Sequence, residues 1–306
     1  MTAVTGAVRI GTRGSPLARQ QTGLIVRELR ERHPSLEFVV QTIQTIGDRN
    51  TDDRISDIGD KGMFVRAIEA ALLDESIDIA VHSLKDVPGD DQHPRLTLAA
   101  FSAREDPRDA LVARCGGRLE DLPTGSRVGT SSLRRRAQLR EARPDITVVD
   151  IRGNVETRLD KTLEGDYDAV ILAAAGLKRL GLERYISEYL SPDHFVPDAG
   201  QGIIVVQTRT GASAQTLVGS IDDAKSRTIA TAERAVAQAL EADCRSPVGA
   251  FAALTGEELS LIGMAASEDC DVVVREKLKG PASDALALGH QLGHTLAKGL
   301  ENRCLY

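Results

Sequence analysis

The sequence repeats one short pattern, in which a buried strand runs into a Gly-Thr turn and then into a helix that begins at serine. The pattern occurs at Ile10-Gly-Thr-Arg-Gly-Ser-Pro-Leu17 and again at Val128-Gly-Thr-Ser-Ser-Leu133. Serine caps the free N–H groups of a helix start, and proline suits the first helical position. The two junctions predict two α/β units of similar construction, each of which aims a helix N-terminus and an arginine at one cleft.

The second junction concentrates hydroxyl and guanidinium groups at a helix start. Ser131 and Ser132 precede Arg134, Arg135 and Arg136, and a helix N-terminus already carries unpaired N–H groups and partial positive charge. Because the whole chain has a formal net charge of −7, this local concentration indicates a defined anionic ligand. The alternative is a solvated helix face, which an arginine run alone would favour.

Arginine also follows strands elsewhere in the chain, so the pattern is not confined to one junction. Solubility alone does not account for arginine at four strand-to-helix turns, and the recurrence favours a binding role. The further arginines are Arg13, Arg152, Arg158 and Arg179.

A second distinctive stretch, His82-Ser-Leu-Lys-Asp-Val-Pro88, follows the strand predicted at 77–81. Ligands of open α/β sheets bind beyond the carboxyl ends of the strands, where Lys85 and Asp86 would lie. Asp86 could there stabilise a cationic intermediate or move a proton. The alternative is a surface turn in which Asp86 bonds local backbone. We expect His82 to be a packed or capping side chain.

The 306 residues are enough for two or three domains. Proline-interrupted segments at 104–109 and 191–202 indicate two crossovers, so the chain leaves the first domain and returns to it. We predict an α/β fold with two hinged domains around a cleft, followed by a small α+β domain. The predicted boundaries are 1–103 with 200–220 for domain 1, 104–199 for domain 2 and 221–306 for domain 3.

Composition disfavours nucleic-acid-binding, membrane and metal-binding proteins. Aromatic residues make up 3% of the chain and tryptophan is absent, so a base-stacking surface for nucleic acid is not expected. Met1–Val8 lacks a basic stretch followed by an apolar one, and no apolar run reaches membrane-spanning length, so we expect a cytoplasmic protein. Cys115, Cys244, Cys270 and Cys304 have no metal-ligand spacing, and no metal is expected.

Two features stay open on the residues alone. Cys244 lies between Asp243 and Arg245; the arginine favours the reactive thiolate, the aspartate opposes it, and most lone cysteines are inert. The polar stretch 44–61 has little periodicity and is either a mobile lid or a disordered insertion.

Six longer motifs occur in order along the chain. They are His82-Ser-Leu-Lys-Asp-Val-Pro, Glu105-Asp-Pro-Arg-Asp-Ala, Val128-Gly-Thr-Ser-Ser-Leu-Arg-Arg, Arg152-Gly-Asn-Val, Ala174-Ala-Gly-Leu-Lys-Arg-Leu-Gly-Leu and Thr231-Ala-Glu-Arg. Together they resemble the porphobilinogen deaminase (hydroxymethylbilane synthase) family. Cys244 with Pro247 and Gly249 is similar to the cofactor-attachment loop of that family, although Glu241-Ala-Asp243 stands where many relatives have glycines.

The resemblance implies a transferase of tetrapyrrole biosynthesis. Such an enzyme joins four porphobilinogen molecules head to tail, loses an ammonia each time, and releases hydroxymethylbilane by hydrolysis. A dipyrromethane cofactor would be held by a thioether to Cys244. The resemblance also implies periplasmic-binding-protein-like α/β domains, and a monomer whose partner is porphobilinogen, with no nucleic acid and no membrane.

Residue roles follow from the matching positions. Asp86 would bind pyrrole nitrogens and stabilise the azafulvenium cation formed as ammonia leaves. The positions implied for the cofactor are Cys244, Lys85, Asp86, Ser132, Arg134, Arg135 and Arg158. The positions implied for the substrate are Arg13, Ser15, Arg152 and Arg179, and those implied for the lid are Lys61 and Phe64.

The chemistry of the substrate agrees with the arginine pattern. Every pyrrole added brings two carboxylates, and guanidiniums bind carboxylates in a two-pronged fashion. The main alternative is a non-enzymatic two-domain module that binds carboxylates or oxyanions, but such a module has no use for a tethering cysteine. A third reading, nucleic-acid binding by the arginines, requires a basic surface, which the acidic balance disfavours.

Overall fold

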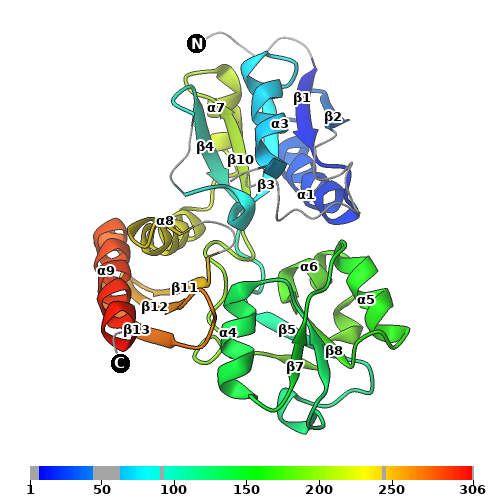
Figure 1. The fold of residues 1–306 in the computed structure, drawn as a ribbon. Coiled ribbons are helices and arrows are strands. Elements are labelled where there is room, and N and C mark those ends of the chain that lie inside the picture. Colours follow the sequence, from blue (N-terminus) through cyan, green and yellow to red (C-terminus); the bar gives the residue numbers. More distant parts are fainter. Residues whose placement is uncertain (1–6, 44–62, 90–92, 243–245, 305–306) are drawn as a thin grey trace. The chain divides into compact units, whose positions relative to one another are not determined.

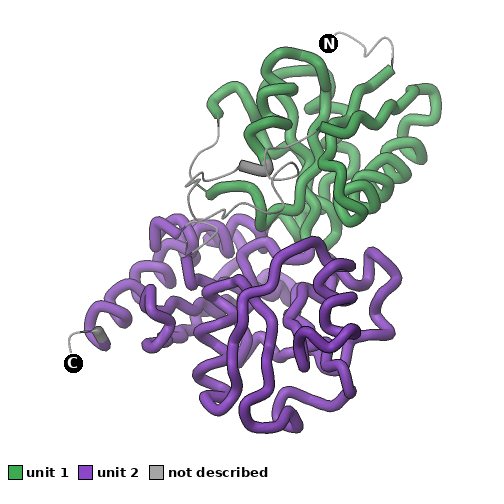
Figure 2. Tube along the Cα trace, turned by 45° about the vertical axis from the view of Figure 1, so that its right-hand side comes forward, with its two compact units in different colours: residues 1–104, 203–227 green, residues 105–202, 228–306 purple. Residues whose placement is uncertain are grey.

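The computed structural model describes residues 7–43, 63–89, 93–242 and 246–304. The chain divides into two compact units, and each is described here by itself (Figure 2). Unit 1 comprises residues 1–104 and 203–227, and unit 2 comprises residues 105–202 and 228–306. Each unit is therefore built from two separate stretches of chain.

Unit 1 contains a five-stranded sheet of order β2-β1-β3-β10-β4 (Figure 1). Its strands are β1 (Val8–Thr12), β2 (Phe38–Thr42), β3 (Ile79–Ser83), β4 (Leu96–Phe101) and β10 (Ile204–Arg209). Strand β1 pairs in parallel with β2 and β3, whereas β10 pairs antiparallel with β3 and β4. The sheet is thus mixed, with β10 supplied by the returning chain.

Helices cover both faces of this sheet, and its central strands β1, β3 and β10 are accordingly buried on both sides. The helices are α1 (Pro16–Arg32), α3 (Met63–Leu73) and α7 (Ser213–Gly219). Helices α1 and α7 pack in a core with Ile10 and Ile79, while α3 packs in another with Ala80. The predicted start of α1 is confirmed, with Ser15 as its N-cap and proline at its first position.

Unit 2 contains a second five-stranded sheet, of order β7-β6-β8-β5-β9. Its strands are β5 (Asp109–Ala113), β6 (Arg127–Gly129), β7 (Thr147–Val149), β8 (Ala169–Ala173) and β9 (Glu188–Tyr189). Its helices are α4 (Leu133–Ala142), α5 (Val155–Leu163) and α6 (Ala174–Arg179). The short strand β9 was not expected from the sequence; two residues carry too little periodicity to reveal a strand.

The two sheets have the same construction. Strand β6 pairs in parallel with β7 and β8, and β5 pairs antiparallel with β8 and β9, which reproduces each pairing of the first sheet. In both sheets the long helix that follows the repeated Gly-Thr turn starts directly after the strand flanked by two parallel neighbours. The predicted pair of similar α/β units is therefore confirmed.

The C-terminal part of unit 2 has a sheet of its own. Strands β11 (Val248–Thr255), β12 (Glu258–Ala266) and β13 (Val273–Pro281) form an antiparallel meander, accompanied by α8 (Ala224–Ala239) and α9 (Ala285–Cys304). A small core joins this sheet to α4 through Ala137, Met264 and Cys270. The α+β character predicted for this region is confirmed, while the domain boundaries, the hinge and the cleft stay predictions.

Candidate active site

The carboxyl ends of β1 and β3 carry the predicted site residues of unit 1. Because β1 and β3 are parallel neighbours, Arg13 and Ser15, which follow β1, lie at the same edge of the sheet as Lys85 and Asp86. Ser15 Oγ accepts the N–H of Ala18 at 3.3 Å and so caps α1. Lys85 and Asp86 are half-buried in a single 3-10 turn, Leu84–Asp86.

The strand end that carries Lys85 and Asp86 is held on both faces of the sheet. On one face, Ser83 and Gln21 exchange hydrogen bonds of 2.9 and 3.1 Å. On the other, His82 Nε2 lies 3.2 Å from Gln207 Oε1, and Gln207 Nε2 donates to Glu69 at 2.8 Å. These contacts and the fully buried Leu84 position the 3-10 turn.

His82 is a packed side chain, as predicted. It is 5% exposed, and burial lowers its pKa to about 4, with Arg13 acting in the same direction and the Gln207 contact opposing it. Gln207 donates its amide N–H to Glu69, so the Gln207 oxygen is the group that faces His82. That oxygen is an acceptor, and His82 Nε2 is therefore the donor. His82 is therefore a neutral donor at neutral pH.

In unit 2, two capped helices begin at the corresponding edge of the sheet. Ser132 caps α4 by accepting the N–H of Arg135 at 3.4 Å, and Asn154 caps α5 by accepting the N–H of Thr157 at 2.8 Å. The predicted site residues of this unit all lie on these helices, just before them, or on α6: they are Ser132, Arg134, Arg135, Arg152, Arg158 and Arg179.

Arg134 and Arg135 do not lie open to solvent but share one buried carboxylate, Asp109. Arg134 Nη1 donates to Oδ2 at 2.8 Å and Arg135 Nη2 donates to Oδ1 at 2.7 Å. The exposed fractions of the three residues are 3%, 6% and 0%. Burial would raise the pKa of Asp109, but the two guanidiniums hold it far below its usual range. Sequence reasoning missed Asp109, since its only signal was its place in the Glu105-Asp-Pro-Arg-Asp motif.

Two members of the predicted anion site are engaged elsewhere, which corrects that prediction. Ser131 Oγ donates to the carbonyl of Ile151 at 2.7 Å and accepts its N–H at 3.1 Å. Arg136 Nη2 donates to Asp150 at 2.5 Å on the flank of α4. Arg136 therefore does not join Arg134 and Arg135, which share Asp109.

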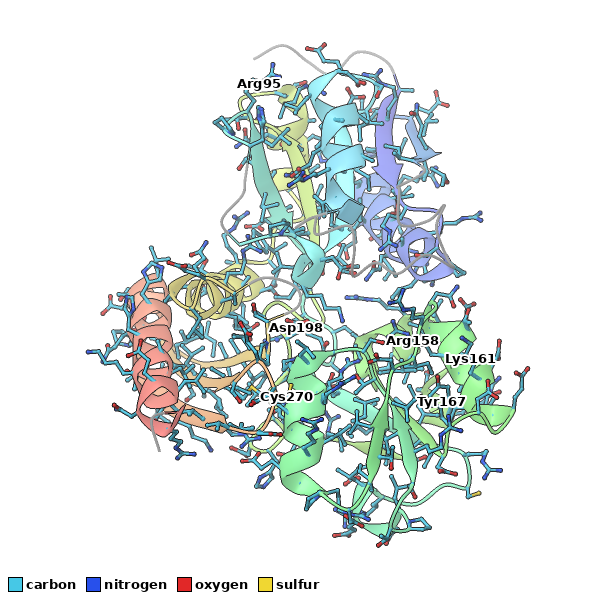
Figure 3. The ribbon with its side chains drawn as sticks, in the orientation of Figure 1. Arg95, Arg158, Lys161, Tyr167, Asp198 and Cys270 are labelled. Carbon is cyan, nitrogen blue, oxygen red and sulfur yellow. The ribbon has the colours of Figure 1, made fainter. Side chains whose placement is uncertain are left out.

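Arg158 and Arg179 are half-buried, whereas Arg134 and Arg135 are buried and Arg152 is exposed. Figure 3 labels Arg158. The structure gives no ion pair to Arg158 among the residues it describes, and its buried Nε has no hydrogen-bond partner there. Burial, together with the charge of Arg135, lowers the pKa of Arg158 to about 10. Arg179 donates to the carbonyl of Gly202 at 2.6 Å, and burial lowers its pKa to about 10 against the opposing charge of Glu105.

Gly249 of β11 lies against the Arg134 side chain. A Cβ placed there would come within 2.8 Å of the carbonyl oxygen of Val196 and 3.1 Å of Arg134 Cδ. Arg134 Nη1 donates to that same Val196 oxygen at 2.6 Å. The C-terminal sheet therefore covers part of the arginine site, and only glycine fits at this point.

Several predicted residues fall outside the described part of the chain. Lys61 and Cys244 are among them, as is the whole stretch 44–61, and the described residues do not include the side chain of Phe64. Helix α8 ends close before Cys244 in a Schellman motif, with the N–H of Glu241 donating to Gln238 and that of Ala242 to Ala237. Glu241 has a φ of 50°, a conformation that favours glycine.

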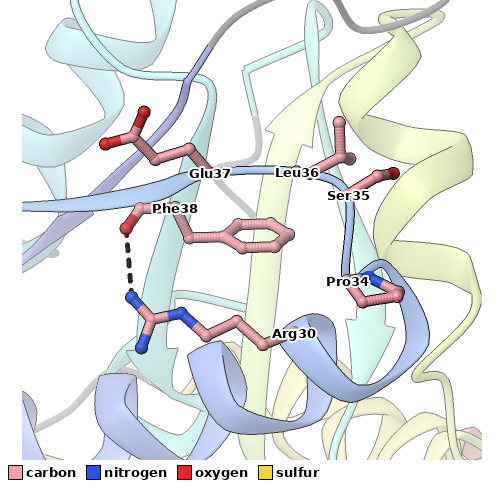
Figure 4. Close-up of a pocket in the computed structure, with 6 residues that line it drawn as sticks. All are labelled: Arg30, Pro34, Ser35, Leu36, Glu37 and Phe38. Carbon is pink, nitrogen blue, oxygen red and sulfur yellow. Dashed lines mark hydrogen bonds between the residues drawn. The ribbon is translucent and has the colours of Figure 1, made fainter.

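Other features of the described residues lie away from these edges. A surface pocket at the opposite edge of the first sheet is lined by Arg30, Pro34, Ser35, Leu36, Glu37 and Phe38 (Figure 4). No cluster of metal-ligating side chains occurs among the described residues. Within the same part of the chain, none of the helices has the length and apolar character needed to cross a bilayer.

Comparison with known proteins decides the family. A family model described as porphobilinogen deaminase, dipyromethane cofactor binding domain, matches residues 8–216, and a second, porphobilinogen deaminase, C-terminal domain, matches residues 228–298. The chain belongs to the porphobilinogen deaminase family. The porphobilinogen deaminase of Roseiflexus castenholzii is 50% identical over 95% of each chain, and that of Sorangium cellulosum is 46% identical over 95% of this chain and 98% of its own.

A more distant likeness is found among solved structures. A TRAP periplasmic solute binding protein from Desulfovibrio salexigens matches with a TM-score of 0.44 and 10% identity, over 72% of this chain and 73% of its own. As a member of this family, the chain is an enzyme of the tetrapyrrole pathway, and residues 8–216 match the part of the family that binds the dipyrromethane cofactor.

Proposed function

We propose that this porphobilinogen deaminase acts as a transferase that condenses four porphobilinogen molecules, using the arginines of unit 2 to hold carboxylates and Asp86 of unit 1 to hold the cation. The observation that carries this proposal is the partnerless, half-buried guanidinium of Arg158 beside the buried Arg134 and Arg135. Buried cations without counter-charges are costly, so such a cluster is best accounted for by an anionic ligand.

The residues present fit a dipyrromethane, which carries several carboxylates. The Nε atoms of Arg134, Arg135 and Arg158 are buried without hydrogen-bond partners among the described residues, and a carboxylate oxygen would satisfy them. Ser132 at the start of α4 adds a hydroxyl, and Cys244 would provide the thioether. When bound, the group supplies the free pyrrole carbon to which the first substrate unit is joined.

Asp86 is proposed as the catalytic carboxylate. Each condensation forms one carbon–carbon bond and releases one ammonia, and the departing ammonia leaves positive charge on the substrate. A carboxylate fixed near that charge lowers the barrier by electrostatic stabilisation. The hydrogen bonds of Ser83 and His82, on the two faces of β3, support this role because they fix the strand end before Asp86. A preorganised group needs no rearrangement during the reaction.

Lys85 and the remaining cations are proposed to hold carboxylates. Lys85 adjoins Asp86 on the same turn, so it would bind the acidic side chains of the pyrrole whose nitrogens Asp86 meets. The residues proposed for the incoming substrate are Arg13, Ser15, Arg152 and Arg179. We further propose that Lys61 and Phe64 belong to a lid, that the protein is cytoplasmic and that it is a monomer. Light scattering on the purified chain checks the monomeric state.

The intact mass of the purified chain tests the proposal. Wild-type protein is expected to exceed its sequence mass by two condensed pyrrole units, and a Cys244→Ser variant is expected to match its sequence mass. Wild-type protein without the excess should gain it when porphobilinogen is added. A wild-type chain that never gains this mass, or a variant that does, would contradict the tethered-primer mechanism.

A further inference from the structure

Asp109 is a fully buried carboxylate to which the proposed reaction assigns no role. It is the first residue of β5 and lies opposite Ala173, the last residue of β8. On its other side, its carbonyl accepts the N–H of Leu190 at 2.9 Å. Its backbone is thus fixed between neighbouring segments at the edge of the sheet where α4 begins.

Both carboxylate oxygens of Asp109 are used. Oδ1 accepts from Arg135 Nη2 at 2.7 Å and from Gln201 Nε2 at 2.9 Å, while Oδ2 accepts from Arg134 Nη1 at 2.8 Å. Gln201 Nε2 also donates to the carbonyl of Pro107 at 2.8 Å, which holds the glutamine in place. Asp109 is therefore the point at which α4, β5 and the chain before β10 meet.

Each guanidinium is held at a second point by a backbone oxygen. Arg134 Nη1 donates to Val196 at 2.6 Å, and Arg135 Nη1 donates to Ile171 at 2.9 Å. Two fixed contacts define the orientation of a planar guanidinium. The Nε of each arginine remains buried and without a hydrogen-bond partner among the described residues, so each guanidinium still has an unsatisfied donor.

One carboxylate hydrogen-bonded between two guanidiniums leaves these three groups with a net charge of +1, and the charge of Asp198 also favours the ionised Arg134. Without Asp109, the two adjacent buried cations would lose the carboxylate that bonds them both, and removing one partner from a buried ion pair is strongly destabilising. With it, the burial of the arginines is tolerated and the surplus charge still attracts an anion. Burial and the positive charge of the nearby Arg135 also oppose the ionisation of Arg158.

We propose that Asp109 is a positioning residue, which holds Arg134 and Arg135 in place before any ligand binds and leaves one positive charge to meet a ligand carboxylate. The first half concerns the chain alone. The second half rests on the proposed function, because it takes the ligand to be the carboxylate-bearing primer.

Urea unfolding of primer-free protein tests the first half. In a Cys244→Ser background we expect Asp109→Asn to lower the unfolding midpoint, and Asp109→Asn with Arg135→Gln to unfold at a higher urea concentration than Asp109→Asn alone, because the second change removes the uncompensated charge. If Asp109→Asn does not fold, recovery of folded protein in the double variant is the equivalent result. If the losses of stability caused by Asp109→Asn and Arg135→Gln simply add in the double variant, the proposal is overturned.

The pair Arg143 and Asp145 provides a matched control at the other end of α4. Arg143 donates to both oxygens of Asp145 at 2.7 Å, but the pair is solvent-accessible. Asp145→Asn and Arg143→Gln are expected to show no recovery in the double variant. A recovery of equal size there would mean that the effect is not particular to the buried Asp109.

Primer loading tests the second half, with Cys244 intact. After incubation with porphobilinogen, intact mass is expected to show at least tenfold slower primer acquisition in Asp109→Asn, partial rescue in Asp109→Glu, and the wild-type rate in Asp145→Asn. Wild-type loading by Asp109→Asn would overturn this half. Failure of the wild-type chain to load would instead contradict the proposed function, and the unfolding experiment would still decide the first half.

Discussion

Arg158 differs from Arg134 and Arg135 in having no counter-charge among the residues described. Burial and the charge of Arg135 both oppose its ionisation and lower its pKa to about 10, so it is still charged at neutral pH. Functional sites commonly retain such unfavourable groups at the expense of stability. Arg158 should therefore contribute nothing to the stability of the fold, or reduce it, and should be required for binding the primer.

We predict that Arg158→Met leaves the primer-free chain as stable as before or stabilises it by about 1 kcal/mol, because an uncompensated charge is removed. The same variant should load primer poorly, because a carboxylate partner is lost. Urea unfolding in a Cys244→Ser background and intact mass with Cys244 present are the two measurements. A large loss of stability would show that Arg158 has a structural partner in the folded chain.

His82 predicts a pH dependence of stability. The unfolded chain takes up a proton near the ordinary histidine pKa of 6.5, whereas the folded chain does so only near 4. Between these values the unfolded state binds more protons, so stability is complete above pH 6.5 and falls by up to about 3 kcal/mol as the pH drops to 4.

His82→Gln should remove this dependence, because glutamine can donate to Gln207 without titrating. The measurement is the difference between the unfolding free energies of wild type and variant from pH 7 to pH 4. A difference that does not change with pH would show that His82 does not titrate within this window.

At the scale of elements, the helix and strand ends place the functional groups. Helix α8 ends in a Schellman motif whose left-handed position is occupied by Glu241, with a φ of 50°. Strand β11 places Gly249 against the carbonyls that adjoin Arg134. One position thus carries a side chain where glycine is favoured, and the other has no room for a side chain.

We predict that Glu241→Gly stabilises the chain by about 1 kcal/mol, because glycine adopts the left-handed conformation without steric cost. Glu241→Ala keeps the Cβ and should give no such gain, which separates strain from charge. Thermal unfolding of both variants is the measurement. Equal effects of glycine and alanine would show that backbone strain at this position is not significant.

We predict that Gly249→Ala costs about 1–3 kcal/mol, because the added methyl overlaps backbone oxygens that cannot move freely. It should also slow primer loading, since it displaces Arg134. Gly23→Ala is the matched control: it lies in α1 with open space around it and should be neutral or stabilising. Similar behaviour of the two variants in unfolding and mass measurements would contradict the close approach seen at β11.

At the scale of the whole molecule, the two units have separate cores, and the chain passes between them three times, after residues 104, 202 and 227. Strand β10 completes the first sheet after the chain has built the second, and β5 is the first strand of the second sheet, formed just after the chain leaves the first unit. Each antiparallel strand is therefore bonded to partners far away in sequence. Cooperative folding within each unit follows from this arrangement.

Core truncations should therefore act within one unit. Leu29→Ala in unit 1, at a fully buried position, is expected to cost about 2–5 kcal/mol and to speed amide hydrogen exchange in β1, β3 and β10. Ile171→Ala in unit 2 should have the reciprocal effect in β5, β6 and β8. Exchange measured by mass spectrometry that rises equally in both units for either variant would show a single cooperative unit.

Local sequence determined the elements and supplied the cations of the proposed site. Strand β1, helix α1 with its Ser15 cap, strand β6 and the start of α4 were all predicted because capping, proline geometry and hydrophobic periodicity act within a few residues. The six motifs likewise indicated the family, because they occur in the family's order along the chain, and the family models confirm it.

Tertiary structure alone decided which of these cations are paired. Asp109 meets Arg134 and Arg135 only because β5 lies beside β8 and α4 begins at the same edge, and that strand order arises from pairings between distant segments. Arg136, one residue further along the helix, points elsewhere and binds Asp150. Electrostatic partners depend on three-dimensional distance and burial, and no local pattern encodes either quantity.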